Sequence, residues 1–171
     1  CSHTWTKAND IRDFQIQGLT IGDSLLKIYS KNEIEKFIKN EAQVNFYPKS
    51  KKFFLLATRG VDEDYDQLNV DLKYLDNKYI IYGVSQYKRM KINKCLNEQN
   101  DIAEEIRQMF DSNDFTEEKY DAEHRADKTG NSRYYNIDFI FSDGNLIRIV
   151  CIQWGNEFAK TGNYHDNIDV S

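Results

Sequence analysis

The stretch YYNIDFIFSDGNLIRIVCIQW, residues 134–154, carries the clearest structural signal in the chain. Two runs rich in β-branched and aromatic residues, 134–141 and 146–154, flank the turn Ser142-Asp143-Gly144-Asn145. Asp-Gly between two such runs is typical of a tight hairpin turn, because both residues tolerate the positive backbone angles that this turn requires. The stretch therefore predicts a pair of antiparallel strands.

A second hairpin is predicted over residues 68–87, a segment dense in β-formers that is interrupted at Asp76-Asn77. The two hairpins align without gaps, with Asn69-Val-Asp71 on Asn136-Ile-Asp138. Two explanations stay open, an internal duplication and the alternation that any two hairpins share. Alternation also places Asp71 and Asp138 on the face opposite to the apolar residues of their strands, which are Val70, Leu72 and Tyr74, and Ile137, Phe139 and Phe141.

Two helices are predicted. Residues 92–110 change to a helical period, with an apolar stripe of Cys95, Ile102, Ile106 and Met109. A shorter helix should begin after Ser30 and end near Asn40, because Ser30 and Glu33 have the spacing of a capping box. The stripe needs an apolar surface to cover it, so the longer helix is expected to lie across the sheet that both hairpins build.

Together these elements predict an α+β fold, an antiparallel sheet of about six strands with two helices packed on it, or alternatively two αβββ repeats. Further strands are expected at 14–19, 52–59 and 120–126. The expected layout is an N-terminal arm or tether at 1–13, a single domain at 14–155 with candidate repeats 19–90 and 91–155, and a polar C-terminal tail at 156–171.

This order of elements resembles the tandem helix-plus-sheet repeat of the β-lactamase-inhibitor-like fold and of small lipoproteins that serve outer-membrane assembly. The resemblance covers most of the chain and includes an Ile-Gly-x-Ser stretch, residues 21–24, ahead of a short helix. It implies a small bacterial envelope protein with tandem helix-plus-antiparallel-sheet repeats. No functional motif is shared.

Composition excludes several classes of function. The chain has 28 acidic and 23 basic residues, a net charge of −5, and no cluster of Lys and Arg, which argues against nucleic-acid binding. It has no apolar run long enough to cross a membrane as a helix. No cofactor is expected, and the predicted partner is another protein.

The three cysteines indicate a compartment. Cys1-Ser2 at the start of the chain is the pattern of a processed bacterial lipoprotein, which makes Cys1 a lipidation candidate. A lipid anchor at Cys1 is the one membrane contact that the sequence leads us to expect. The alternative is that the given sequence simply starts at an arbitrary position. Cys95 on the apolar helix face and Cys151 in the last strand are predicted to form a disulfide where helix meets sheet. Both features favour an extracytoplasmic protein, in the bacterial envelope or secreted.

Gly22-Asp23-Ser24-Leu25 spells the nucleophile motif of the GDSL esterases and lipases. Such an enzyme requires a histidine with an aspartate three residues before it, and here Gly162 precedes His165. The predicted antiparallel hairpins also differ from the parallel sheet of that family. Ser24 or Asp23 capping a short helical turn is the better interpretation, and no catalytic residue is assigned.

Asp62, Asp64 and Asp66 have the alternating carboxylates that open a calcium loop, which makes them a weak Ca²⁺ candidate. Gln67 and Lys73 stand where that loop requires Gly and Glu, so a solvated acidic loop is favoured. The spacing of His3, His124 and His165 predicts no zinc site.

The expected function is therefore that of a non-enzymatic, secreted or envelope-attached protein-interaction module that offers a sheet face or a sheet edge to its partner. Two alternatives remain at this point. One is a GDSL-like serine hydrolase that uses Ser24, and the other is a structural subunit of a phage or bacterial surface assembly.

Overall fold

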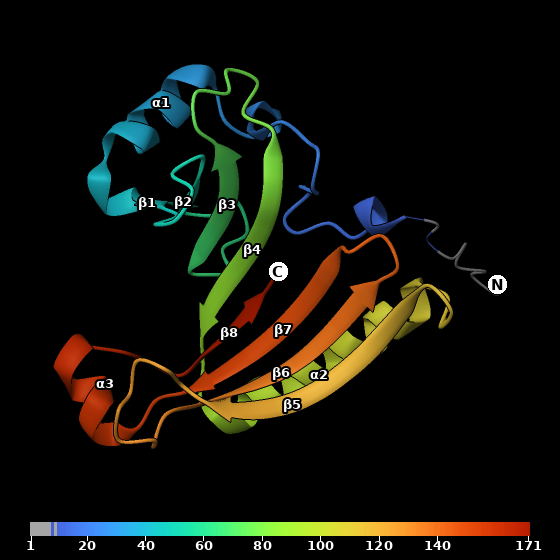
Figure 1. Ribbon diagram of the computed structural model, residues 1–171, viewed down its shortest axis with the longest axis vertical. Helices are drawn as coiled ribbons and strands as arrows, with labels where there is room; N and C mark the ends of the chain where they lie inside the picture. The colour runs from blue at the N-terminus through green and yellow to red at the C-terminus, as the bar shows by residue number, and fades with distance from the viewer. Residues whose placement is uncertain (1–7, 9) are drawn as a thin grey trace. The chain divides into compact units, whose positions relative to one another are not determined.

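The computed structural model describes residue 8 and residues 10–171 (Figure 1). These residues divide into two compact units: residues 12–87, and residues 88–171 with the described residues up to Ile11. We call them the 12–87 unit and the 88–171 unit. The α-helices are α1 (Lys31–Lys39), α2 (Ile92–Met109) and α3 (Asn156–Gly162), and short 3-10 helices are η1 (Ile11–Asp13), η2 (Leu25–Lys27) and η3 (Glu41–Gln43).

The 12–87 unit is a four-stranded antiparallel meander with one helix. Its strands, β1 (Val44–Phe46), β2 (Phe53–Thr58), β3 (Gln67–Lys73) and β4 (Ile81–Arg89, which ends in the other unit), are neighbours in that order. The predicted capping box begins α1, because Ser30 accepts from the Glu33 N–H and the Glu33 carboxylate accepts from the Ser30 N–H. Alternate strand residues form the core with the helix: Ile34, Phe54, Leu56, Leu68, Val70 and Leu72.

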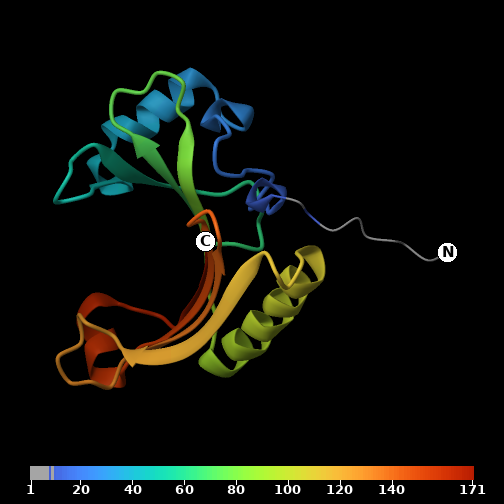
Figure 2. The same ribbon diagram turned by 45° about the vertical axis from the view of Figure 1, so that its right-hand side comes forward.

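The 88–171 unit has the same plan, with strand order β8-β7-β6-β5. Its strands are β5 (Phe115–Glu123), β6 (Arg133–Phe141), β7 (Leu146–Gln153) and β8 (Asn167–Val170). Helix α2 lies along one face of this sheet (Figure 2) and contacts β7 and β8. Within this layer the Gln99 amide donates to the carbonyls of Tyr135, at 2.9 Å, and Ile149, at 2.8 Å, which fixes the helix to β6 and β7.

The fold class is the predicted one, but the counts differ. The described residues contain eight strands and three α-helices, not about six and two. The predicted polar tail at 156–171 contains α3 and β8, and Ile168 and Val170 of β8 are buried against β7. The predicted strand at 14–19 is wrong: Ile16 and Leu19 face each other across a tight turn in which Gln17 and Gly18 have positive φ.

The predicted position of the long helix is correct for one hairpin only. Helix α2 covers the 134–154 hairpin, whereas the 68–87 hairpin lies in the other unit, whose helix α1 contacts β2. The buried face of α2 also differs from the predicted stripe. Cys95 and Ile106 are buried as expected, but Gln99 and Ala103 are the other buried residues, and Ile102 and Met109 are half-buried.

The described residues of the segment expected to be an arm contact the rest of the fold. The Ala8 N–H donates to the Met109 carbonyl at the end of α2, 2.8 Å away, and Ile11 in η1 is buried. The remainder of residues 1–9, including Cys1 and His3, lies outside the described residues. The boundary between the two units falls between Tyr87 and Lys88, close to the boundary of the candidate repeats.

Candidate functional site

Cys95 and Cys151 form a disulfide, as predicted, with their Cα atoms 5.9 Å apart. Cys95 is presented by the first turns of α2, and Cys151 by β7 opposite Tyr135 of β6 and Ile168 of β8. Neither cysteine is exposed. The bond therefore joins the helix to the middle of the sheet inside the 88–171 unit, and it is a structural bond.

Ser24 caps η2, as the sequence suggests. Its hydroxyl donates to the Lys78 carbonyl, at 2.6 Å, and accepts from the Leu26 N–H, at 3.2 Å. Both hydroxyl functions are thus used by the backbone. No hydrogen bond to a histidine or an acid activates this serine among the described residues.

The acidic loop, His124 and His165 lie in the described part of the chain, and His3 lies outside it. Among residue 8 and residues 10–171, no three His, Cys, Asp or Glu side chains gather closely enough to hold an ion. The Asp62 carboxylate instead accepts from the Asp64 N–H at 2.9 Å, a turn contact. His124 packs on Trp154, with ring centroids 4.3 Å apart, and burial lowers its pKa.

The face of each sheet that points away from its helix carries a central carboxylate. In the 88–171 unit this is Asp138, which accepts a bidentate pair of hydrogen bonds from Arg148, with Nε to Oδ1 at 2.8 Å and Nη2 to Oδ2 at 2.5 Å. The Tyr120 hydroxyl lies 3.3 Å from Asp138 Oδ2. Arg148 is the cross-strand partner of Asp138 on β7, so this carboxylate is neutralised by its neighbour.

Asp71 is the corresponding residue of the 12–87 unit in the sequence alignment of the hairpins. It also accepts from a tyrosine, because the Tyr47 hydroxyl donates to its Oδ1 at 2.8 Å. Its cross-strand partner on β4 is Gly83, where Asp138 has Arg148. Asp71 forms no ion pair among the described residues, and burial raises its pKa against the opposing effect of the Tyr47 hydrogen bond.

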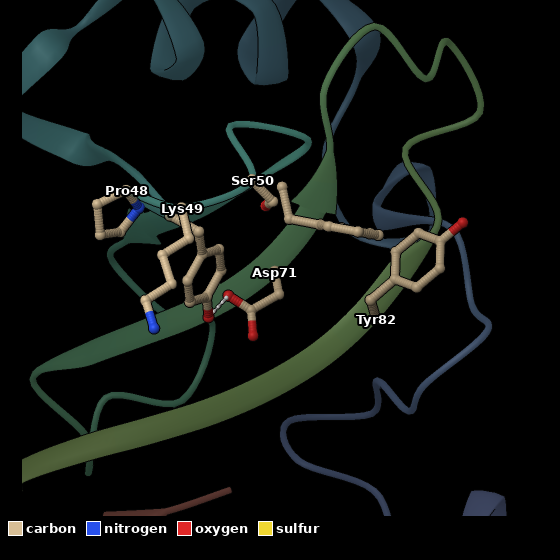
Figure 3. Close-up of a pocket in the computed structure, with 7 residues that line it drawn as sticks. Pro48, Lys49, Ser50, Asp71 and Tyr82 are labelled. Atoms are coloured by element: carbon tan, nitrogen blue, oxygen red, sulfur yellow. Dashed lines mark hydrogen bonds between the residues drawn. The ribbon is translucent and has the colours of Figure 1, made fainter.

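A pocket of about 570 Å³ opens at Asp71 (Figure 3). Its walls are the aromatic rings of Tyr47, Phe53 and Tyr82, and the loop residues 48–50 line one side. Phe53 and Tyr82 meet edge to face with centroids 5.0 Å apart. Burial, together with the adjacent Asp71, raises the pKa of Tyr47 to about 12, so its hydroxyl keeps its proton and remains a donor at neutral pH.

Strand β5 forms an open edge of the 88–171 sheet. It pairs with β6 on one side, and no described strand pairs with it on the other. The His124 N–H donates to the Ser132 carbonyl at 2.8 Å, and hydrogen-bonded pairs recur at every second residue of an antiparallel ladder. The backbone groups of the odd-numbered β5 residues, Glu117, Lys119, Asp121 and Glu123 among them, therefore point to the open side.

The side chains of this edge are acidic. Glu117, Glu118, Asp121 and Glu123 outweigh the single Lys119. Arg107 forms an ion pair with Glu117, and Arg133 with Asp121. Glu118 and Glu123 form no ion pair among the described residues, which leaves the edge with an uncompensated negative charge.

Sequence reasoning missed both the pocket and the acidic edge. The alignment of the hairpins singles out Asp71 and Asp138, but nothing in the pattern links either to its tyrosine. Residues 111–119 are polar, which is typical of a loop, although β5 begins at Phe115. A strand exposed on both faces and open at one edge has no hydrophobic alternation to reveal it.

Among the described residues, no helix combines the length and the apolar composition needed to span a membrane. No protein-family model, no curated protein and no solved structure matches the chain.

Proposed function

We propose that the protein is a non-enzymatic, extracytoplasmic interaction module that binds an extended segment of a partner protein along β5. The observation that carries this proposal is the open edge of β5, nine residues long with every second backbone N–H and C=O directed outward. Such an edge is a template for strand addition, in which main-chain hydrogen bonds supply affinity and alternate side chains supply specificity.

The charge of the edge selects the partner. A strand that adds to β5 lies beside Glu118 and Glu123, which form no ion pair within the described chain. These two side chains lie on opposite faces of the sheet, because they are five residues apart on one strand. A partner strand with a Lys or Arg beside each of them, and so with basic residues on both of its faces, would neutralise them, since opposite charges across neighbouring strands are stabilising. A second copy of β5 would instead place acidic residues against acidic residues, so the charge disfavours self-association through this edge.

The Cys95–Cys151 disulfide supports the proposed compartment. Disulfides persist in oxidising surroundings such as the bacterial periplasm or the cell exterior and are rare in the reducing cytosol. Secretion or attachment to the envelope, with Cys1 as the lipidation candidate, agrees with such a bond. The backbone contacts of Ser24 support a binding role over hydrolysis, because they use both functions of its hydroxyl.

Selection from a peptide library tests this function and reveals the sequence pattern that the edge prefers. A displayed library of random peptides as long as β5 is selected on the purified, oxidised protein. We expect enriched sequences that carry Lys or Arg on both faces of the added strand, at the positions beside Glu118 and Glu123. Binding should weaken as salt concentration rises, because the charges involved are exposed.

Two substitutions of Lys119 separate the backbone edge from its side chains. Lys119→Pro removes one outward N–H and leaves the β6 ladder intact, since edge strands tolerate proline there. Lys119→Gln removes the same charge but keeps that N–H. Selected peptides should bind Lys119→Gln and lose most of their affinity for Lys119→Pro. Equal binding to both variants, or enrichment without basic residues, would overturn the proposal.

A further inference from the structure

The pocket at Asp71 is independent of the β5 edge and contains an unneutralised carboxylate in an aromatic surround. Asp71 comes from β3 and Tyr82 from β4, while Pro48, Lys49 and Ser50 come from the loop that follows β1 (Figure 3). The Asp71 side chain is half-buried, and Tyr82 is 51% exposed. The pocket is therefore open to solvent on the side of Tyr82, and a ligand can enter from there to reach the Asp71 carboxylate.

The 88–171 unit also has a carboxylate beside a tyrosine hydroxyl, there with a cation in place, although its tyrosine comes from the adjacent strand and Tyr47 comes from beyond β2. Asp138 accepts from the Arg148 guanidinium and lies beside the Tyr120 hydroxyl. In the 12–87 unit the carboxylate and the tyrosine are present as Asp71 and Tyr47, but the cross-strand position is Gly83. What the Asp71 site lacks is the cation.

Gly83 leaves room for this geometry. A Cβ at that position would lie 2.5 Å from Asp71 Oδ2, so any other residue there would make the carboxylate shift. The carboxylate thus lies directly over the glycine backbone. Lys49 lines the pocket but forms no ion pair with Asp71 among the described residues, so it does not neutralise the carboxylate.

We propose that this pocket binds a small organic cation of the guanidinium type, with its N–H groups on the Asp71 carboxylate and its flat face against the aromatic walls. A guanidinium forms paired hydrogen bonds with a carboxylate and stacks on aromatic rings, which a compact ammonium does less well. The rings of Phe53, Tyr47 and Tyr82 supply the face that attracts a cation. The ligand would occupy the place that Arg148 fills in the other unit.

Titration with four small probes tests the proposal: ethylguanidinium, its neutral shape analogue N-ethylurea, ethylammonium and free L-arginine. Binding is followed by amide chemical shifts on the isotopically labelled full chain. Ethylguanidinium is expected to bind with a dissociation constant of roughly 1 mM or tighter. Its shifts should concentrate at Asp71 and Gly83 and exceed those of the other unit.

Variants identify the groups responsible. Asp71→Asn keeps an acceptor for Tyr47, and Tyr82→Ala removes an exposed wall; each should weaken ethylguanidinium binding by about tenfold. The matched controls are Glu63→Gln, an exposed acid outside the pocket, and Tyr74→Ala, a tyrosine 50% exposed that does not line it. Both controls should bind as the unmodified protein does.

Several results would overturn the assignment. N-ethylurea binding as well as ethylguanidinium would make the pocket merely apolar, and tighter binding of ethylammonium would exclude the guanidinium preference. Binding that persists unchanged in Asp71→Asn and Tyr82→Ala would place the ligand elsewhere. No saturable shift with any probe, in a protein whose variants remain folded by circular dichroism, would contradict the proposal altogether.

Discussion

Reduction of the Cys95–Cys151 disulfide is expected to destabilise the 88–171 unit strongly. The bond closes a loop with a sequence separation of 56 residues, and release of that constraint on the unfolded chain corresponds to about 4 kcal/mol in the chain-entropy estimate. Domains of ordinary size are stable by only about 5–15 kcal/mol, so this change is a large share of the total. With a urea dependence of about 2 kcal/mol per M, the unfolding midpoint should fall by about 2 M.

Fluorescence of Trp154, beside the end of β7, measures this in a Trp5→Phe background where it is the only tryptophan. Urea unfolding is compared for the oxidised protein, the reduced protein and the Cys95→Ala/Cys151→Ala variant. Adding reductant should lower the urea midpoint of the oxidised protein and leave the urea midpoint of the Cys95→Ala/Cys151→Ala variant unchanged. A reduced protein that unfolds at the same urea concentration as the oxidised one would refute the structural role of the bond.

Three further perturbations have defined outcomes. Ile106→Asp places a carboxylate at a position that is 1% exposed and should lower the free energy of unfolding by several kcal/mol, so that cooperative thermal unfolding is lost. The control Asn97→Asp, at an exposed position of the same helix, should still unfold cooperatively. Asp127 accepts four hydrogen bonds from Ser132 and Thr129, which lower its pKa to about 2. Its ionised carboxylate therefore contributes fully to folding stability above about pH 4, and this contribution is lost as pH falls through about 2, so thermal melts in acid should show a loss of stability that is absent from Asp127→Asn. Ser24→Ala removes the cap of η2 and should lower the free energy of unfolding measured in urea by about 1 kcal/mol. It should leave the turnover of a chromogenic ester at the level of the unmodified protein, and a specific loss of turnover would support the hydrolase alternative.

Local signals in the sequence were sufficient where a short-range rule determines the structure. The Asp143-Gly144 turn, the capping box of Ser30 and Glu33 and the helical period of 92–110 each specify a conformation within a few residues. The Cys95–Cys151 bond could be predicted because both residues lie on apolar faces that must meet. In all four cases burial and local geometry agree.

Prediction failed where the environment comes from distant residues. β8 reads as a polar tail because Asn167 and Asp169 alternate with Ile168 and Val170 over only four residues, too few for a period. Gln99 was not expected in the core, since only the carbonyls of β6 and β7 make its burial acceptable. The pocket depends on Tyr47 reaching Asp71 across the sheet, which no spacing in the sequence indicates.

Hydrogen exchange along β5 tests the proposed strand addition most directly. The amides of Glu118 and Tyr120 point to β6 and should be protected in the free protein, while those of Glu117, Lys119 and Asp121 point outward and should exchange fast. On binding of a selected basic peptide, we expect the odd-numbered amides alone to become protected. Unchanged exchange at Lys119 in a saturated complex would contradict strand addition at this edge.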